Sequence, residues 1–191
     1  MKIRRAKKSD LNQYVNLGRY GFILIKKEAN NKKTKRVYLR KSAADALLKA
    51  KNYLGEGYNF KIAEGKRAKS EQRAIIKDCE RDFKRKKYQD WKKMLIKYTG
   101  GYDILKKKRF APDTHLGGGA VDLTIMKGKK ELSMGGIKLN EKSHLNYFEK
   151  KKKLTKKEKE IRDNRRLLKK VMKKARFKPS LHEWWHWGYK K

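Results

Sequence analysis

Two segments that lie far apart in this chain carry residues suited to one metal site, so the fold has to bring them together. The first runs from Asp113 to Asp122 and holds His115 and three consecutive glycines, and the second is Glu183-Trp184-Trp185-His186. His115, Asp122 and His186 supply three ligands, which leaves one position of a tetrahedral zinc open and Glu183 as a spare carboxylate. Structural zinc sites use four protein ligands, whereas catalytic sites keep an open position. The pattern predicts a hydrolase with one Zn²⁺ per chain, acting on a peptide bond.

The second segment also allows a different interpretation. His182-Glu183-Trp184-Trp185-His186 fits the H-E-x-x-H motif, in which two histidines one helical turn apart bind zinc and the glutamate is the base. Pro179-Ser180 before it and Gly188 after it leave little room for a helix, and its tryptophans favour strands. We therefore expect ligands from both segments. Either interpretation gives a zinc hydrolase with Glu183 as the base.

The chain is strongly basic. It holds 57 Lys+Arg against 20 Asp+Glu, a formal charge of +37 over 191 residues. Such a charge attracts polyanions, and we expect some non-specific polyanion binding. Because the lysines are spread from end to end, the charge favours a general compositional habit over a dedicated binding surface.

The length suits one domain, and we expect a single zinc peptidase domain over residues 1–191. The N-terminus is basic, but the apolar run at 21–25 is too short for a signal peptide. No segment is long enough to span a bilayer. These features predict a cytoplasmic protein. The single cysteine, Cys79, cannot form an internal disulfide.

Hydropathy patterns predict a mixed α+β fold, a small antiparallel sheet with flanking helices, in which short strands carry the motif residues. Extended segments around a turn at 29–32 are expected within residues 20–40. Further strands are expected at 58–63, 120–126 and 184–187, with a short one after the turn at 127–130. We expect a helix that is capped by Ser42 and runs to about Leu54, one long helix from Ser70 to Tyr98, and a third helix after the capping box that joins Thr155 to Glu158.

The paired motifs resemble those of the zinc D-alanyl-D-alanine dipeptidases of the vancomycin-resistance type. These are peptidoglycan metallopeptidases with a hedgehog-like α+β fold. The pattern His-x-x-Gly-x-Ala-x-Asp over 115–122 and the C-terminal Glu-Trp-Trp-His carry the resemblance. It covers most of the chain, because 37–40, 49–51, Met134-Gly135 and Ser143-His144 also fit.

The resemblance implies roles for individual residues. His115, Asp122 and His186 would bind zinc, and Glu183 would be the general base and acid. Arg67, which follows the strand expected at 58–63, stands in the place of the family's catalytic arginine and would hold the oxyanion. The implied reaction is hydrolysis of D-Ala-D-Ala in cell-wall peptide metabolism. His144 and His182 are expected to support the site or the structure.

Three departures from the family pattern concern the substrate. Gly65-Lys66-Arg67-Ala68 replaces the usual Gly-Tyr-Arg-Pro, and Asp113 stands where a serine is common. Residues 136–141 lack the family's Phe-Asp, whose aspartate contacts the free amino group of the dipeptide. Asp113 or Glu141 is a candidate to replace it in binding substrate.

Two alternatives to a dipeptidase follow. A peptidoglycan endopeptidase or carboxypeptidase acting on longer stem peptides would suit the missing aspartate. A basic nucleic-acid-binding protein on a peptidase scaffold would suit the charge.

Overall fold

The computed structural model describes residues 13–191 apart from 26, 30–31, 35 and 138. Contacts divide the chain into two compact units, Met1–Lys66 with Pro112–Lys191, and Arg67–Ala111. The second unit is therefore inserted into the sequence of the first. Each unit is described by itself, and the single domain expected over 1–191 stays a prediction.

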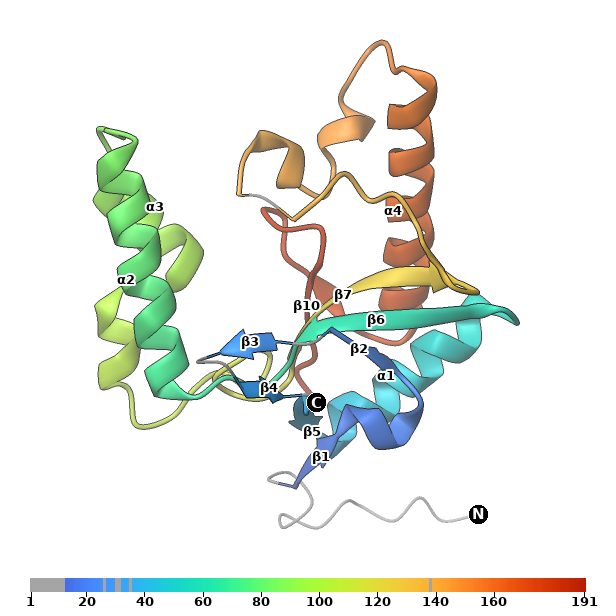
Figure 1. Cartoon of the computed structure of the whole chain (residues 1–191), viewed down its shortest axis with the longest axis horizontal. Coiled ribbons are helices and arrows are strands. Elements are labelled where there is room, and N and C mark those ends of the chain that lie inside the picture. Colours follow the sequence, from blue (N-terminus) through green and yellow to red (C-terminus); the bar gives the residue numbers. More distant parts are fainter. Residues whose placement is uncertain (1–12, 26, 30–31, 35, 138) are drawn as a thin grey trace. The chain divides into compact units, whose positions relative to one another are not determined.

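The first unit is built around a six-stranded sheet in the order β2-β6-β7-β10-β9, with β8 paired to β7 (Figure 1). β2 runs parallel to β6, and the other pairs are antiparallel. The expected antiparallel sheet is thus confirmed except at its β2 edge. The strands are β2 (Ile23–Leu24), β6 (Tyr58–Glu64), β7 (Ala120–Lys127), β8 (Lys130–Glu131), β9 (Lys178–Pro179) and β10 (His186–Gly188).

Two short two-stranded sheets accompany this sheet. β1 (Tyr14–Asn16) pairs with β5 (Tyr38–Arg40), and β3 (Lys27–Ala29) pairs with β4 (Lys32–Thr34), both antiparallel. Extended structure within residues 20–40 is therefore confirmed. The turn expected at 29–32 includes residues 30–31, which lie outside the described residues.

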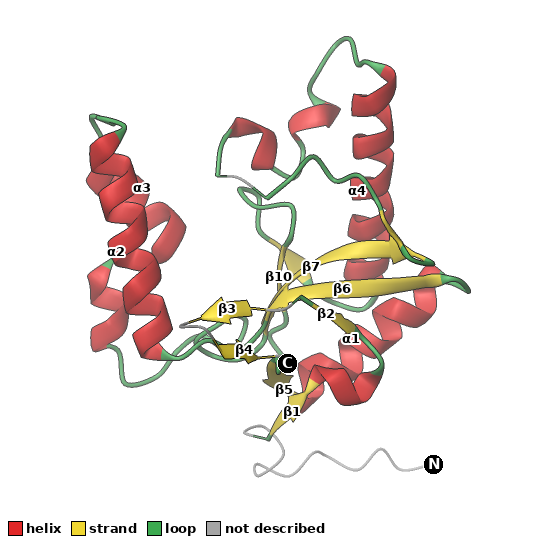
Figure 2. Cartoon of the chain, in the orientation of Figure 1, coloured by secondary structure: helices red, strands yellow, loops and turns green. Residues whose placement is uncertain are grey.

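Two helices, α1 (Lys41–Leu54) and α4 (Lys156–Lys174), contact each other and share one hydrophobic core with the sheet (Figure 2). Their inner faces are apolar at helical spacing, which drives them onto the core. The capping box is confirmed, since Thr155 N donates to Glu158 Oε2 at 3.0 Å and Glu158 N donates to Thr155 Oγ1 at 3.3 Å. Ser42 was wrongly expected to cap α1. The helix begins one residue earlier, and the Ser42 hydroxyl donates to the carbonyl of Lys191.

Short 3₁₀ helices complete the first unit at Leu17–Tyr20, Glu141–Ser143 and Tyr147–Glu149. The last two lie between β8 and α4, in a stretch that is otherwise irregular. Among the residues that the structure describes, no helix is long and apolar enough to cross a membrane.

The second unit is a helical hairpin, so the single long helix expected over 70–98 is wrong. α2 (Lys69–Arg85) and α3 (Trp91–Thr99) are followed by a 3₁₀ helix at Tyr102–Lys106. The chain reverses at Lys87, whose φ of 52° is left-handed, and Tyr88 N donates to the carbonyl of Phe83. Phe83 and Trp91 are eight residues apart, a spacing that would place both on the broad apolar face of a continuous helix. Hydrophobic periodicity therefore continues through the reversal and does not reveal it.

Candidate metal centre

The sheet register places two of the expected ligands side by side. β10 pairs with β7 so that His186 lies directly opposite Asp122. Residues directly opposite on neighbouring antiparallel strands have Cβ atoms about 4.5–5.5 Å apart, within reach of a shared ion. The last strand of the chain therefore completes a site begun on β7.

The third ligand is delivered by a tight, glycine-rich turn before β7. Gly118 N donates to the carbonyl of His115 at 3.1 Å, and Gly118 has a left-handed φ of 77°. A Cβ on Gly119 would lie 2.2 Å from the carbonyl oxygen of Pro112. These positions need glycine for different reasons, one for backbone conformation and the other for close approach. The expectation that the glycines let the chain turn beside the metal site is consistent with this geometry.

The three side chains converge on a small space. His186 Nδ1 lies 2.9 Å from Asp122 Oδ1, His115 Nε2 lies 3.2 Å from the same oxygen, and the two ring nitrogens are 3.1 Å apart. Across the described part of the chain, this is the one group of three or more such side chains close enough together to hold a metal ion. His115 is buried, and the other two side chains are partly exposed.

A backbone contact sets the tautomer of His115. Its Nδ1 lies 2.7 Å from the carbonyl oxygen of Gly65, which accepts hydrogen bonds and has none to give. Nδ1 therefore carries the proton and donates it. In the neutral ring this leaves the lone pair on Nε2, which faces Asp122 and His186. Metal-binding histidines are commonly oriented in this way by a second hydrogen bond.

The spacing of the donor atoms suits zinc. Ligands about 2.0–2.1 Å from a tetrahedral ion are about 3.3–3.4 Å from one another. The three observed separations of 2.9, 3.1 and 3.2 Å are within a few tenths of an ångström of this value. Two imidazoles and one carboxylate are also a ligand set that zinc accepts. The residues present therefore fit the ion.

The carboxyl group of Asp122 is held in its ionised form. Burial opposes ionisation, but the electrostatic attraction and hydrogen-bond contacts of His115 and His186 outweigh it and keep the pKa of Asp122 well below its ordinary value. An anionic ligand beside two neutral imidazoles would leave a bound Zn²⁺ with a net positive charge. That charge would act on water or on a substrate carbonyl.

The backbone of Glu183 is held by the turn that leads into β10. Its carbonyl accepts from His186 N at 3.1 Å, and the next residue, Trp184, donates its backbone N–H to the carbonyl of Ser143. Residues 181–185 contain no helix, so the helical H-E-x-x-H interpretation is wrong. The strand expected at 184–187 is also shorter than predicted, because it begins at His186.

Comparison with known proteins identifies a family. A family model described as D-ala-D-ala dipeptidase matches residues 21–191, nearly the whole chain. The chain belongs to this family. Membership of the family makes it a metallopeptidase. Its mixed helix and strand content is consistent with the α+β fold of such a peptidase. No curated protein matches the chain.

Two other expected site residues lie in different surroundings. Arg67 is the first residue of the second unit, where its guanidinium donates a 2.6 Å hydrogen bond to Gln72 Oε1. Asp113 begins the turn of His115, and its backbone lies against Gly188 of β10, where a Cβ would be 2.5 Å from the Asp113 carbonyl. The roles of both residues in the peptidase stay predictions.

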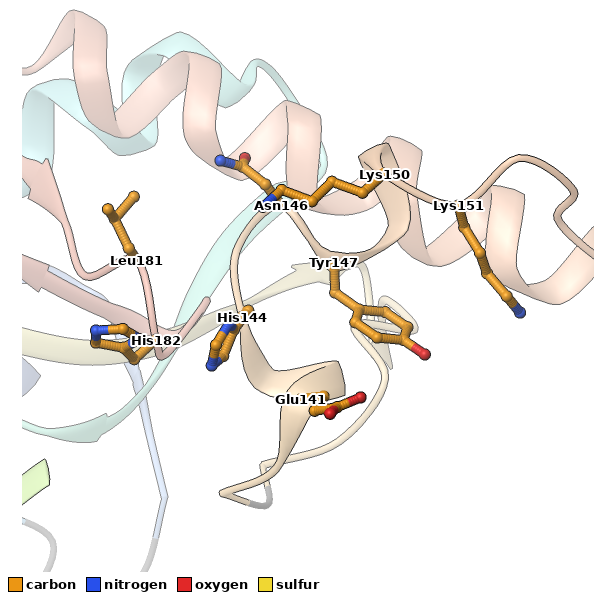
Figure 3. A pocket seen from close by; sticks show the side chains of 8 residues that line it. All are labelled: Glu141, His144, Asn146, Tyr147, Lys150, Lys151, Leu181 and His182. Atoms are coloured by element: carbon orange, nitrogen blue, oxygen red, sulfur yellow. The ribbon is translucent and has the colours of Figure 1, made fainter. Parts of the chain in front are cut away.

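His182 lies outside the His115 cluster. Its ring packs edge-on against His144, with centroids 5.1 Å apart. Both rings line a pocket in the first unit (Figure 3).

Arg165 of α4 contacts Trp184, the residue after Glu183, and was missed by the sequence analysis. Its buried guanidinium donates to the carbonyls of Met134 and His144 and packs over the rings of Phe148 and Trp184. Burial lowers its pKa to about 10. A signal was present, because Arg165 falls on the apolar face of α4, four residues after Ile161 and three before Leu168.

Proposed function

We propose that the chain is a zinc-dependent peptidase that hydrolyses the bond between two D-alanine residues of cell-wall peptides. The observation that carries the proposal is the convergence of His115 Nε2, Asp122 Oδ1 and His186 Nδ1. The family match supports a peptidase and the resemblance of the motifs supports this substrate. His115, Asp122 and His186 are the proposed ligands of one zinc ion.

When bound, zinc supplies Lewis-acid chemistry, which makes water more acidic and a carbonyl carbon more electrophilic. In the proposed reaction the Glu183 carboxylate takes a proton from the attacking water as its oxygen bonds to the scissile carbonyl carbon. The C–N bond then breaks, and Glu183 returns the proton to the leaving amine nitrogen. Water is added across the bond, and the carboxylate is regenerated.

Arg67 is proposed to stabilise the negative charge that develops on the carbonyl oxygen. A guanidinium donates charge-assisted hydrogen bonds, and such bonds to a developing oxyanion contribute about 3–4 kcal/mol to catalysis. Support for this role comes from the place of Arg67 directly after β6 and Gly65-Lys66, which matches the family's arginine by motif.

The proposal is tested by zinc content together with activity. The parent and Glu183→Gln are purified, zinc is quantified, and release of D-Ala from D-Ala-D-Ala is measured. We expect about one zinc per chain in both proteins, with release by the parent alone. A parent that binds zinc but releases no D-Ala from the dipeptide or from stem peptides would refute the substrate. A protein that takes up no zinc and binds DNA with a steep salt dependence would favour the nucleic-acid alternative.

Longer wall peptides are the second candidate substrate. The stretch 136–141 has no aspartate to contact a free amino group, and Glu141 within it faces a pocket large enough for more than a dipeptide. A peptidase of this kind would cleave the terminal D-Ala from a stem peptide faster than it cleaves the free dipeptide.

A further inference from the structure

A pocket in the first unit is structurally joined to the segment that carries Glu183. It has a volume of 580 Å³, within the range of about 300–1,000 Å³ typical of small-ligand sites. His182 lines one wall and directly precedes Glu183, so their Cα atoms are about 3.8 Å apart. A residue that lines the pocket is therefore the immediate sequence neighbour of the proposed base.

This wall is held by a short ladder of hydrogen bonds. Leu145 N donates to the carbonyl of Leu181 at 3.1 Å, Ser143 Oγ donates to that of His182 at 2.7 Å, and Trp184 N donates to that of Ser143 at 3.0 Å. The segments 143–145 and 181–184 thus lie side by side. A ligand bound in the pocket would therefore contact the same paired segments that hold the backbone of Glu183.

The lining of the pocket includes hydrogen-bond donors for an anion. Its eight lining residues include two lysines, Lys150 and Lys151, the two histidines, and one carboxylate, Glu141. Lys151 pairs with Glu158 and points away from the histidines, whereas the side chain of Lys150 extends toward Asn146 (Figure 3). Lys150 is therefore the lysine placed to meet a ligand.

Asn146 adds neutral donors at the same place. Its Oδ1 accepts a hydrogen bond from Lys169 Nζ at 3.2 Å, which assigns the amide orientation. The Nδ2 group thus keeps two N–H donors, in a pocket that Lys150 also lines. An ammonium together with amide N–H groups binds a carboxylate through charge-assisted hydrogen bonds.

We propose that this pocket binds a carboxylate on the part of a peptide substrate that lies beyond the D-Ala-D-Ala unit. The proposal rests on the peptidase function above and specifies its substrate as a longer, acidic peptide. Lys150 and Asn146 would bind the carboxylate, and the His144–His182 wall would guide the peptide toward Glu183.

The test compares two peptides that differ in one group. L-Ala-γ-D-Glu-L-Lys-D-Ala-D-Ala carries a free α-carboxylate on its D-Glu, and its isoglutamine form carries a carboxamide there. Binding is measured by titration calorimetry on zinc-loaded Glu183→Gln, so that hydrolysis does not interfere. We expect the carboxylate peptide to bind about tenfold more tightly. Adding Lys150→Ala should remove this preference.

Lys152→Ala is the matched control, because it removes the same charge from the same basic run but does not line the pocket. It should keep the preference, whereas an equal loss in both variants would show general attraction to a basic protein and overturn the proposal. Equal binding of both peptides by Glu183→Gln would overturn it as well. Hydrolysis by the parent is scored separately. Selective, Lys150-dependent binding without any cleavage would refute the peptidase function and leave the carboxylate pocket standing.

Discussion

Gly65 lies so close to the backbone of Tyr38 that a Cβ there would be 2.4 Å from the Tyr38 carbonyl oxygen. β6 ends just before this glycine, and the Gly65 carbonyl accepts the hydrogen bond from His115 Nδ1. The close approach fixes the position of the carbonyl. The carbonyl in turn fixes the ring that points its other nitrogen at Asp122.

Gly65→Ala is therefore expected to weaken zinc binding without touching a ligand. The new methyl group pushes the backbone away from Tyr38, which moves the carbonyl and frees His115 to rotate. Loss of a comparable supporting contact typically costs 10–100-fold in metal affinity, and we expect about tenfold or more. Competition with a chromophoric chelator measures the zinc affinity of the variant and the parent. Gly18→Ala is the control, since its Cβ would meet only side-chain atoms, the nearest at 3.3 Å. Parent-like affinity in Gly65→Ala would contradict the role of this carbonyl.

The candidate ligand set could be predicted from the sequence because each proposed ligand is a side chain in a recognisable motif. The structure brings together His115, Asp122 and His186 as expected. The Gly65 contact could not be read, because any residue has a carbonyl and its use depends on a turn packing against β5. Arg165 is a different case. Its place on the apolar face of α4 was a signal of burial, but its partners are backbone carbonyls of loops, which the sequence does not identify.

The fold was predictable where local signals determine it and not where the chain reverses. The Thr155–Glu158 capping box marked the start of α4 correctly because both partners are local. The α2–α3 reversal at Lys87 had no glycine or proline to mark it, since a lysine adopts the left-handed conformation there. Only packing of one helix on the other distinguishes the hairpin from a continuous helix, and that packing is not local.

Zinc should stabilise the folded chain through the three proposed ligands. A ligand at 100 times its dissociation constant adds about 2.7 kcal/mol to the free energy of unfolding. We expect a rise of this size in the parent and its loss in His186→Ala, measured by denaturant unfolding with zinc and with chelator. His144→Ala is the control, because His144 packs against His182 outside the cluster. If zinc still raises the free energy of unfolding of His186→Ala by the same amount, His186 is not a ligand.

Two neighbouring arginines of α4 should differ sharply in their effect on stability. Arg165→Met keeps much of the side-chain volume but removes charged hydrogen bonds to buried carbonyls, at an expected cost of about 2–3 kcal/mol. Arg166→Met removes an exposed pair with Glu149 and should cost less than about 1 kcal/mol. Urea unfolding of both variants gives the comparison. Equal costs would show that Arg165 does not hold the Met134 loop in place.

The pH dependence of stability should reveal the capping box of α4. A hydrogen bond from Lys151, followed by that from Thr155 N, lowers the pKa of Glu158 to about 2 from an ordinary 4.5. A carboxyl group with a lowered folded pKa stabilises the protein above its unfolded pKa, and this contribution is lost as pH falls through the folded value. Glu158→Gln should therefore be less stable than the parent at pH 7, and the difference should shrink between about pH 4.5 and pH 2.

Glu160→Gln is the control, because Glu160 lies on the same helix and is exposed, and its stability should match that of the parent throughout this pH range. Denaturant unfolding at several pH values in this range gives the free energy of unfolding of each protein. A difference between Glu158→Gln and the parent that does not change with pH would mean that the carboxylate charge of Glu158 does not stabilise the start of the helix.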